Sequence, residues 1–161
     1  RTGGKRRMTQ YKYGSPEELI QAAKENIVTA AAESGISADD LQDCIDDAEE
    51  EIYSFASWLM VGQKLKTELA EFKLDGSILE DWCQYIKDEA YGNEALARAI
   101  LLPEKKMADC LAVLLKYSFE NSFDVPTEIV KKALPNNNFK VKLGIPGMAK
   151  ARRLIVDFFT D

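Results

Sequence analysis

The sequence of 161 residues contains no histidine, and this absence removes a large part of enzyme chemistry. Without an imidazole there is no Ser-His-Asp or Cys-His nucleophile pair, no histidine metal site and no histidine pH switch. The glycine-rich nucleotide loops G-x-x-x-x-G-K-[ST] and G-x-G-x-x-G are also missing. Acids are abundant, but no two of them stand out in an apolar setting as an acid-base pair would. We therefore predict a non-enzymatic binding protein that carries no cofactor.

Cysteine is scarce, and long apolar runs are absent. The three cysteines, Cys44, Cys83 and Cys110, are widely spaced and fall in segments with helical periodicity. Their odd number and the lack of a C-x-x-C motif argue against a disulfide framework and against a zinc site. No apolar run reaches the roughly 18 residues that a membrane span needs, and the basic start lacks the apolar stretch of a signal peptide. We expect reduced core thiols in a cytoplasmic protein with no metal and no membrane contact.

What is present is a globular composition, 46% hydrophobic and 30% charged. We predict a flexible basic segment over residues 1–12 and a single helical domain over residues 13–161. Trp58, Trp82 and the pair Phe158-Phe159 sit at helical positions that are typical of a core.

Capping signals divide this domain into helices. Ser15-Pro16-Glu17-Glu18 starts a first helix, which we expect to run over residues 16–34 and to stop at Gly35. A second starts after Ser37 and keeps its apolar stripe to residue 59, or past Gly62 to about Lys73. Further helices are expected over residues 78–90 and 94–102, from Pro103 to about 120, over 126–134 and over 148–159. Residues 139–143 alternate as a strand does, without an obvious hairpin partner. The prediction is an all-α bundle of about six helices with one short extended segment near residues 139–143.

The net charge of −6 conceals three segments of alternating sign. Residues 1–12 carry five basic side chains and no acid, whereas residues 13–130 carry 9 basic against 25 acidic side chains. Residues 131–161 carry seven basic side chains against two acids. An acidic body with basic ends indicates self-complementary electrostatics or a basic face that meets an anionic partner.

The two basic ends are the predicted nucleic-acid-binding surface. The first is typical of a cationic arm that lies along phosphates and releases counterions. In the second, Lys140 and Lys142 are two apart and are expected on the same side of a strand. The candidate contacts are Lys5, Arg6, Arg7, Lys12, Lys140, Lys142, Lys150, Arg152 and Arg153. Two alternatives stay open, namely that these residues neutralise the acidic body within the fold, or that they bind a protein partner.

Eight acids crowd the thirteen residues from Asp39 to Glu51. On one continuous helix five of them share a side, and we call this set the acidic ridge: Asp39, Asp43, Asp46, Asp47 and Glu50. A calcium loop needs a glycine turn that lets several oxygens converge, and the regular helical pattern disfavours it. The other interpretations are a solvated face whose first acids favour the positive helix N-terminus, and a surface that imitates phosphates before a basic protein partner. The last would make the protein an inhibitor or adaptor.

Residues 79–134 resemble the PcfK-like family of small proteins encoded on conjugative plasmids and related mobile elements. The similarity rests on Trp82-Cys83-Gln84-Tyr85-Ile86-Lys87-Asp88-Glu89-Ala90, on Ala95 and Ala97, on Pro103-Glu104-Lys105-Lys106-Met107-Ala108-Asp109-Cys110-Leu111 and on Val125 to Ala133. It implies an accessory role on a mobile element, without assigned catalysis. Separately, residues 11–19 after a basic stretch are similar to the opening of some phage small terminase subunits. We therefore expect an accessory or regulatory protein of a phage or plasmid.

Overall fold

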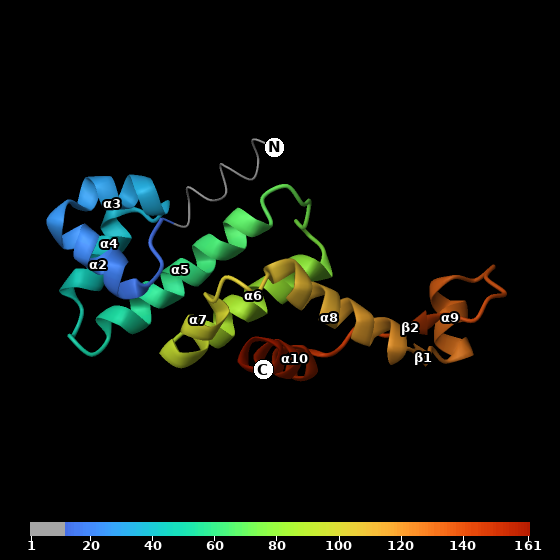
Figure 1. The fold of residues 1–161 in the computed structure, drawn as a ribbon. Coiled ribbons are helices and arrows are strands. Elements are labelled where there is room, and N and C mark those ends of the chain that lie inside the picture. The colour runs from blue at the N-terminus through green and yellow to red at the C-terminus, as the bar shows by residue number, and fades with distance from the viewer. Residues whose placement is uncertain (1–11) are drawn as a thin grey trace.

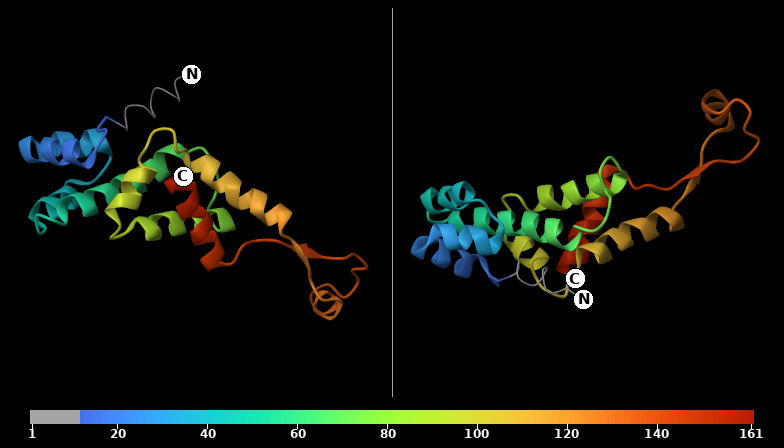
Figure 2. Two further views of the ribbon diagram at one scale, coloured as in Figure 1. Left: turned by 60° about the horizontal axis from the view of Figure 1, so that its bottom comes forward. Right: turned by 90° about the horizontal axis from the view of Figure 1, so that it is seen from above.

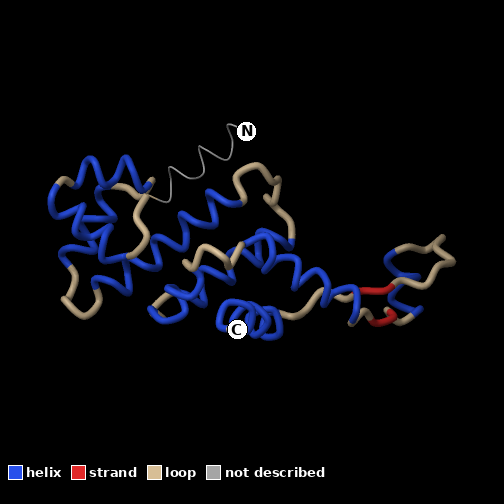
Figure 3. The backbone as a smooth tube through the Cα atoms, viewed as in Figure 1, coloured by secondary structure: helices blue, strands red, loops and turns tan. Residues whose placement is uncertain are grey.

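The computed structural model describes residues 12–161, and most of this part of the chain is helical (Figure 1). Its nine helices are α2 (Pro16–Glu25), α3 (Ile27–Ser34), α4 (Ala38–Asp46), α5 (Ile52–Glu68), α6 (Ile78–Ala90), α7 (Glu94–Ile100), α8 (Met107–Glu120), α9 (Thr127–Ala133) and α10 (Met148–Thr160). Two short strands, β1 (Phe123–Asp124) and β2 (Lys142–Leu143), form an antiparallel pair, drawn in red in Figure 3. The all-α class is confirmed, whereas the expected number of about six helices is too low.

The first of the extra helices arises because the expected helix over residues 16–34 breaks at Asn26. This residue has an extended backbone, and its side-chain oxygen accepts a hydrogen bond from the Thr29 amide at 3.2 Å. Asn26 therefore ends α2 and caps α3, as asparagine does well. The apolar period continues across the break, so periodicity alone predicts one helix where there are two.

A second break separates α4 from α5, where the sequence predicts one continuous helix. Asp47 is extended and ends α4, and its carboxylate accepts a hydrogen bond from the Ala48 amide at 2.8 Å. Helix α5 begins at Ile52, passes Gly62 without interruption and ends at Glu68, so the expected extension to about Lys73 does not occur.

The main core lies between α5, α6, α7, α8 and α10. Its largest fully buried side chains include Trp82, Ile86, Ile100, Ile155 and Phe159. Each such side chain contributes about 1.5–3 kcal/mol on burial. The last helix thus returns from the far end of the chain to complete the core, and smaller clusters hold α2, α3 and α4 against α5. Trp58, expected in the core, is only partly buried there.

The junction between α7 and α8 is organised by a buried lysine of α5. The Lys64 side chain is 2% exposed, and its ammonium donates hydrogen bonds to the carbonyl oxygens of Ile100 at 2.6 Å, Leu102 at 2.9 Å and Lys105 at 2.7 Å. One turn later, a Glu68 oxygen accepts from the Met107 amide at 2.7 Å. This contact fixes the start of α8 at Met107, so the expected start at Pro103 is wrong.

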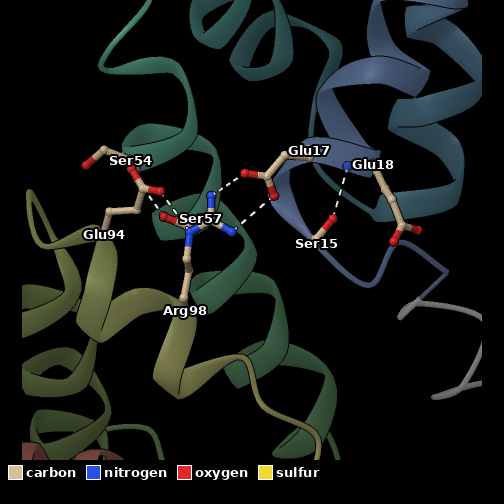
Figure 4. Close-up of polar contacts among 7 residues, drawn as sticks. All are labelled: Ser15, Glu17, Glu18, Ser54, Ser57, Glu94 and Arg98. Carbon is tan, nitrogen blue, oxygen red and sulfur yellow. Dashed lines mark hydrogen bonds and ion pairs between the residues drawn. The ribbon is translucent and has the colours of Figure 1, made fainter.

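Arg98 ties the α2 end of the molecule to α7. Figure 4 shows its guanidinium between two carboxylates, with both terminal nitrogens on Glu17 and Nε donating to Glu94 at 2.8 Å. Because both oxygens of Glu17 are engaged, the orientation of α2 toward α7 is fixed.

After α8 the chain leaves the helical body as a hairpin arm, residues 123–143, which comprises β1, α9 and β2. Figure 2 shows it reaching away from the other helices. Phe123 pairs with Leu143 and Asp124 with Lys142, so the extended segment does have a partner, some twenty residues earlier. The arm closes at Gly144, where an added Cβ would lie 1.8 Å from the Ser118 carbonyl oxygen. Only glycine permits this approach of the returning strand to the end of α8.

Candidate nucleic-acid interface

Of the four N-terminal basic residues expected to bind nucleic acid, the structure describes only one. Lys5, Arg6 and Arg7 lie outside the described residues. Lys12 is described, and its ammonium pairs with Glu33 of α3 at 2.7 Å. Since α3 and α9 lie at opposite ends of the molecule (Figure 1), Lys12 is far from the basic residues of the hairpin arm.

The hairpin arm gathers four lysines: Lys131 and Lys132 in the last turn of α9, Lys140 in the loop just before β2, and Lys142 in β2. As the spacing of two predicts, the last two reach the same carboxylate, with Lys142 Nζ 2.7 Å and Lys140 Nζ 3.9 Å from Asp124 oxygens. The hydrogen bond from Lys142 lowers the pKa of Asp124, and the charge of Lys140 adds to this effect. All four ammonium groups belong to exposed residues.

A groove of about 410 Å³ runs along the arm between α9 and the loop that leads to β2. Lys131 and Lys140 line it together with Asn137, Asn138 and Phe139. The Asn137 side chain accepts a hydrogen bond from the Phe139 amide at 2.9 Å, which stabilises the turn before that residue. Phe139 is 80% exposed. The groove therefore combines cations, amides and one accessible aromatic face, the groups that contact phosphates and stacked bases.

The basic residues of α10 are divided. Lys150 stands over the Tyr117 ring at 5.3 Å, close to the base of the hairpin arm, and Arg153 is exposed. The Arg152 guanidinium lies over the Tyr85 ring and 3.5 Å from Asp88, with Glu89 at 3.6 Å. It thus stabilises the packing of α10 on α6, which is the neutralising role left open by the sequence. No acid occupies the first turn of α10.

The acidic ridge does not form one helical face. Asp39, Asp43 and Asp46 belong to α4, Asp47 is its C-cap, and Glu50 lies in the turn before α5. The break at Asp47 redirects the chain, so the i, i+3 and i+4 spacing holds only for the first three. All five residues are exposed. Behind them, burial and the charges of Asp40, Asp43 and Asp47 raise the pKa of the Cys44 thiol to about 12.

Within residues 12–161, no group of three Cys, Asp or Glu side chains is arranged to hold a metal ion, and all three cysteines are free thiols. In the same part of the chain, no helix combines the length and the apolar character that crossing a bilayer requires. Comparison with models of protein families, with curated proteins and with solved structures gives no match. The similarity of residues 79–134 to the PcfK-like family stays an expectation.

Sequence reasoning missed Phe139 and the asparagines beside it as groove residues. The run Asn136-Asn137-Asn138 after Pro135 indicates a turn, but nothing local predicts that the turn folds back beside α9. The sequence also does not show that Lys131 and Lys132 lie near Lys140, because only the pairing of β1 with β2 brings these lysines together.

Proposed function

We propose that this protein is a non-enzymatic accessory or regulatory protein that binds nucleic acid through the hairpin arm and the start of α10. The observation that carries the proposal is the arm itself, a protruding element with four exposed lysines, a groove and the exposed ring of Phe139. The resemblance of residues 79–134 supports the further proposal that its context is a phage or a plasmid.

The ion pairs with Asp124 do not oppose this role. Exposed lysine-carboxylate pairs contribute only about 0–1 kcal/mol, so a phosphate can take the place of Asp124 at little cost. Each phosphate that a lysine neutralises releases counterions and adds about 0.7–0.9 to the salt dependence of log K. Stacking of one base on an aromatic ring adds about 1–3 kcal/mol. The arm therefore supplies both attraction to any backbone and a preference for unpaired bases.

The test is a titration of the full chain against a fluorescently labelled single-stranded DNA oligomer, followed by anisotropy at low salt. Replacing Lys131, Lys132, Lys140 and Lys142 with alanine should weaken binding by at least about tenfold, because the phosphate contacts are lost. Phe139→Ala should weaken single-stranded binding by about fivefold or more and leave duplex binding nearly unchanged.

A matched control removes the same charge from lysines of the body. Lys24, Lys66, Lys73 and Lys116 are all exposed, and none belongs to the hairpin arm. If the alanine variant of these four loses as much affinity as the arm variant, or if the native chain does not bind at all, the proposal is wrong.

The exposed acids favour a second candidate, an adaptor or inhibitor that meets a basic protein. Residues 25–63 contain ten acids and no lysine or arginine, so the potential around α4 is strongly negative. Neutralising Asp43, Asp46 and Asp47 to asparagine should weaken binding of a lysine-rich peptide. The control neutralises Asp75, Asp81 and Asp109, which are also exposed. Equal loss in both variants would exclude a specific role for the acidic ridge.

A further inference from the structure

A second groove, of about 420 Å³, lies at the opposite end of the molecule from the hairpin arm, where the α4–α5 turn meets the α6–α7 turn. Its lining combines three aromatic rings, those of Phe55, Trp58 and Tyr91, with the carboxylates of Asp47 and Glu51. We propose that this groove binds an arginine side chain of a basic polypeptide. The proposal is independent of nucleic-acid binding and gives the second candidate function a defined site.

The aromatic wall is held in place. Phe55 and Trp58 are one turn apart on α5, with ring centroids 6.0 Å apart and planes only 16° from parallel. Tyr91 stands edge-on to Trp58, at 5.2 Å and 78°. The indole nitrogen of Trp58 donates a hydrogen bond to the Lys87 carbonyl oxygen at 3.0 Å, which fixes the ring. A groove whose rings are already oriented loses little conformational entropy when a ligand enters.

Tyr91 is brought to the groove by a sharp turn. It is the C-cap of α6, and the following residue, Gly92, has a φ of 69°, which glycine adopts at no cost. The Tyr91 side chain is left 67% exposed. A tyrosine in the main core would be covered, so this ring is available to a ligand.

The chemistry of the lining selects a cation. The π faces of tryptophan and tyrosine attract positive charge, and the Lys87 ammonium already stands 5.6 Å from the centre of the Trp58 ring without lining the groove. Within residues 12–161, the Glu51 carboxylate has no ion-pair partner, and Glu51 provides no side-chain hydrogen bond to cap α5. Rings and carboxylates together suit a cation with a flat, apolar surface.

Arginine fits this description better than lysine does. The guanidinium is planar, stacks on aromatic faces and presents a fork of donors to carboxylates, whereas an ammonium is a compact and strongly hydrated point charge. The long negative segment around the groove would draw a basic polypeptide toward it before the side chain enters.

The experiment is isothermal titration of the full chain with three capped peptides that differ at one type of position: Gly-Arg repeats, the same with lysine, and the same with citrulline. Citrulline keeps the shape of arginine without its charge. We expect the arginine peptide to bind, the lysine peptide to bind about fivefold more weakly, and the citrulline peptide not to bind measurably.

Two substitutions with matched controls locate the site. Tyr91→Ala and Glu51→Gln should each lower the affinity for the arginine peptide about fivefold. Glu49→Gln, which removes a nearby charge outside both the groove and the acidic ridge, and Phe72→Ala, which removes an exposed ring elsewhere, should change its affinity less than about twofold. Far-UV circular dichroism checks that every variant is folded.

Three results would overturn the inference. The first is equal binding of the arginine and citrulline peptides, which would mean that charge is not read. The second is equal loss of affinity in Glu49→Gln and Glu51→Gln together with equal binding of the arginine and lysine peptides. This result would reject the groove while keeping the acidic surface as the second candidate function. The third is unchanged binding to Tyr91→Ala.

Discussion

Replacing the buried Lys64 with methionine removes the group that holds the α7–α8 junction together. Methionine has a similar length and keeps most of the packing around the aliphatic stem. What is lost is the ammonium, and with it three hydrogen bonds to backbone carbonyl oxygens at 2.6–2.9 Å. Glu68, which lies 3.9 Å from that ammonium, also loses its positive neighbour.

The cost follows from what each carbonyl can do afterwards. The bond to Ile100 is buried, and an acceptor left unsatisfied there costs about 1–3 kcal/mol. The bonds to Leu102 and Lys105 are only partly buried, so water can replace the ammonium, and about 0.5–1 kcal/mol is lost at each. The free energy of unfolding should fall by about 3 kcal/mol, a large part of the 5–15 kcal/mol of a typical domain.

Urea unfolding followed by far-UV circular dichroism measures this change. The control is Lys66→Met, two residues away on the same helix but exposed, which should change the free energy of unfolding by less than about 0.5 kcal/mol. If Lys64→Met and Lys66→Met have the same effect, the reasoning about the buried ammonium is refuted.

Further perturbations test the contacts that position the hairpin arm and α2. Gly144→Ala places a Cβ against the Ser118 carbonyl oxygen, so the base of the hairpin arm must shift. Hydrogen exchange of the Val125 amide, which donates to the Val141 carbonyl oxygen at 2.8 Å, should then accelerate. Gly147→Ala, which has open space around the added Cβ, should leave this exchange rate unchanged. Asp124→Asn frees the two lysines from their shared carboxylate and should raise DNA affinity about twofold or more in the anisotropy assay, and a lower affinity would contradict the role assigned to them. The hydrogen bonds from Arg98 lower the pKa of Glu17, so this pair stabilises the fold above the carboxyl's unfolded pKa of about 4.3 and ceases to do so as the pH falls through its folded-state value. Arg98→Met should therefore reduce the free energy of unfolding in urea at neutral pH by about 1 kcal/mol or less, and this reduction should shrink as the pH is lowered below about 4.3. An equal loss at neutral and at acidic pH would show that packing, not charge, is what Arg98 contributes.

The elements that local sequence predicts well are those that local contacts create. Ser15, Ser37, Ser77 and Asn93 each cap the helix expected after them, and each side chain accepts a hydrogen bond from an amide two or three residues on. Such a cap involves only neighbours in the chain, so its pattern survives in the sequence.

Two helix breaks were missed because apolar spacing continues across them. Asn26 and Asp47 are polar residues in otherwise regular stripes, and the stripe records which side chains are buried, not whether the backbone stays helical. The error at Asp47 matters for function, since it turns an expected continuous acidic ridge into a helix face, a cap and a turn. It also creates the corner that lines the aromatic groove.

Long-range contacts account for the remaining differences. From the sequence, Lys64 is expected only to support its helix through an i, i+4 pair with Glu68, because the carbonyl oxygens that its ammonium contacts are more than thirty residues away. The partner of Lys142 and Leu143 is a strand of two residues, too short to show alternation. The candidate residues of the C-terminal third were found from charge alone, but their division between the arm and the α6 contact depends on the tertiary fold.

The salt dependence of DNA binding tests the central claim most directly. The measurement is the slope of log K against log salt for the native chain and for the variant that lacks Lys131, Lys132, Lys140 and Lys142. If the hairpin arm neutralises phosphates, the slope of the variant should be smaller in magnitude by about 3, close to 0.7–0.9 for each lysine removed. Equal slopes for the two proteins would contradict the account, because the arm would then make no phosphate contacts.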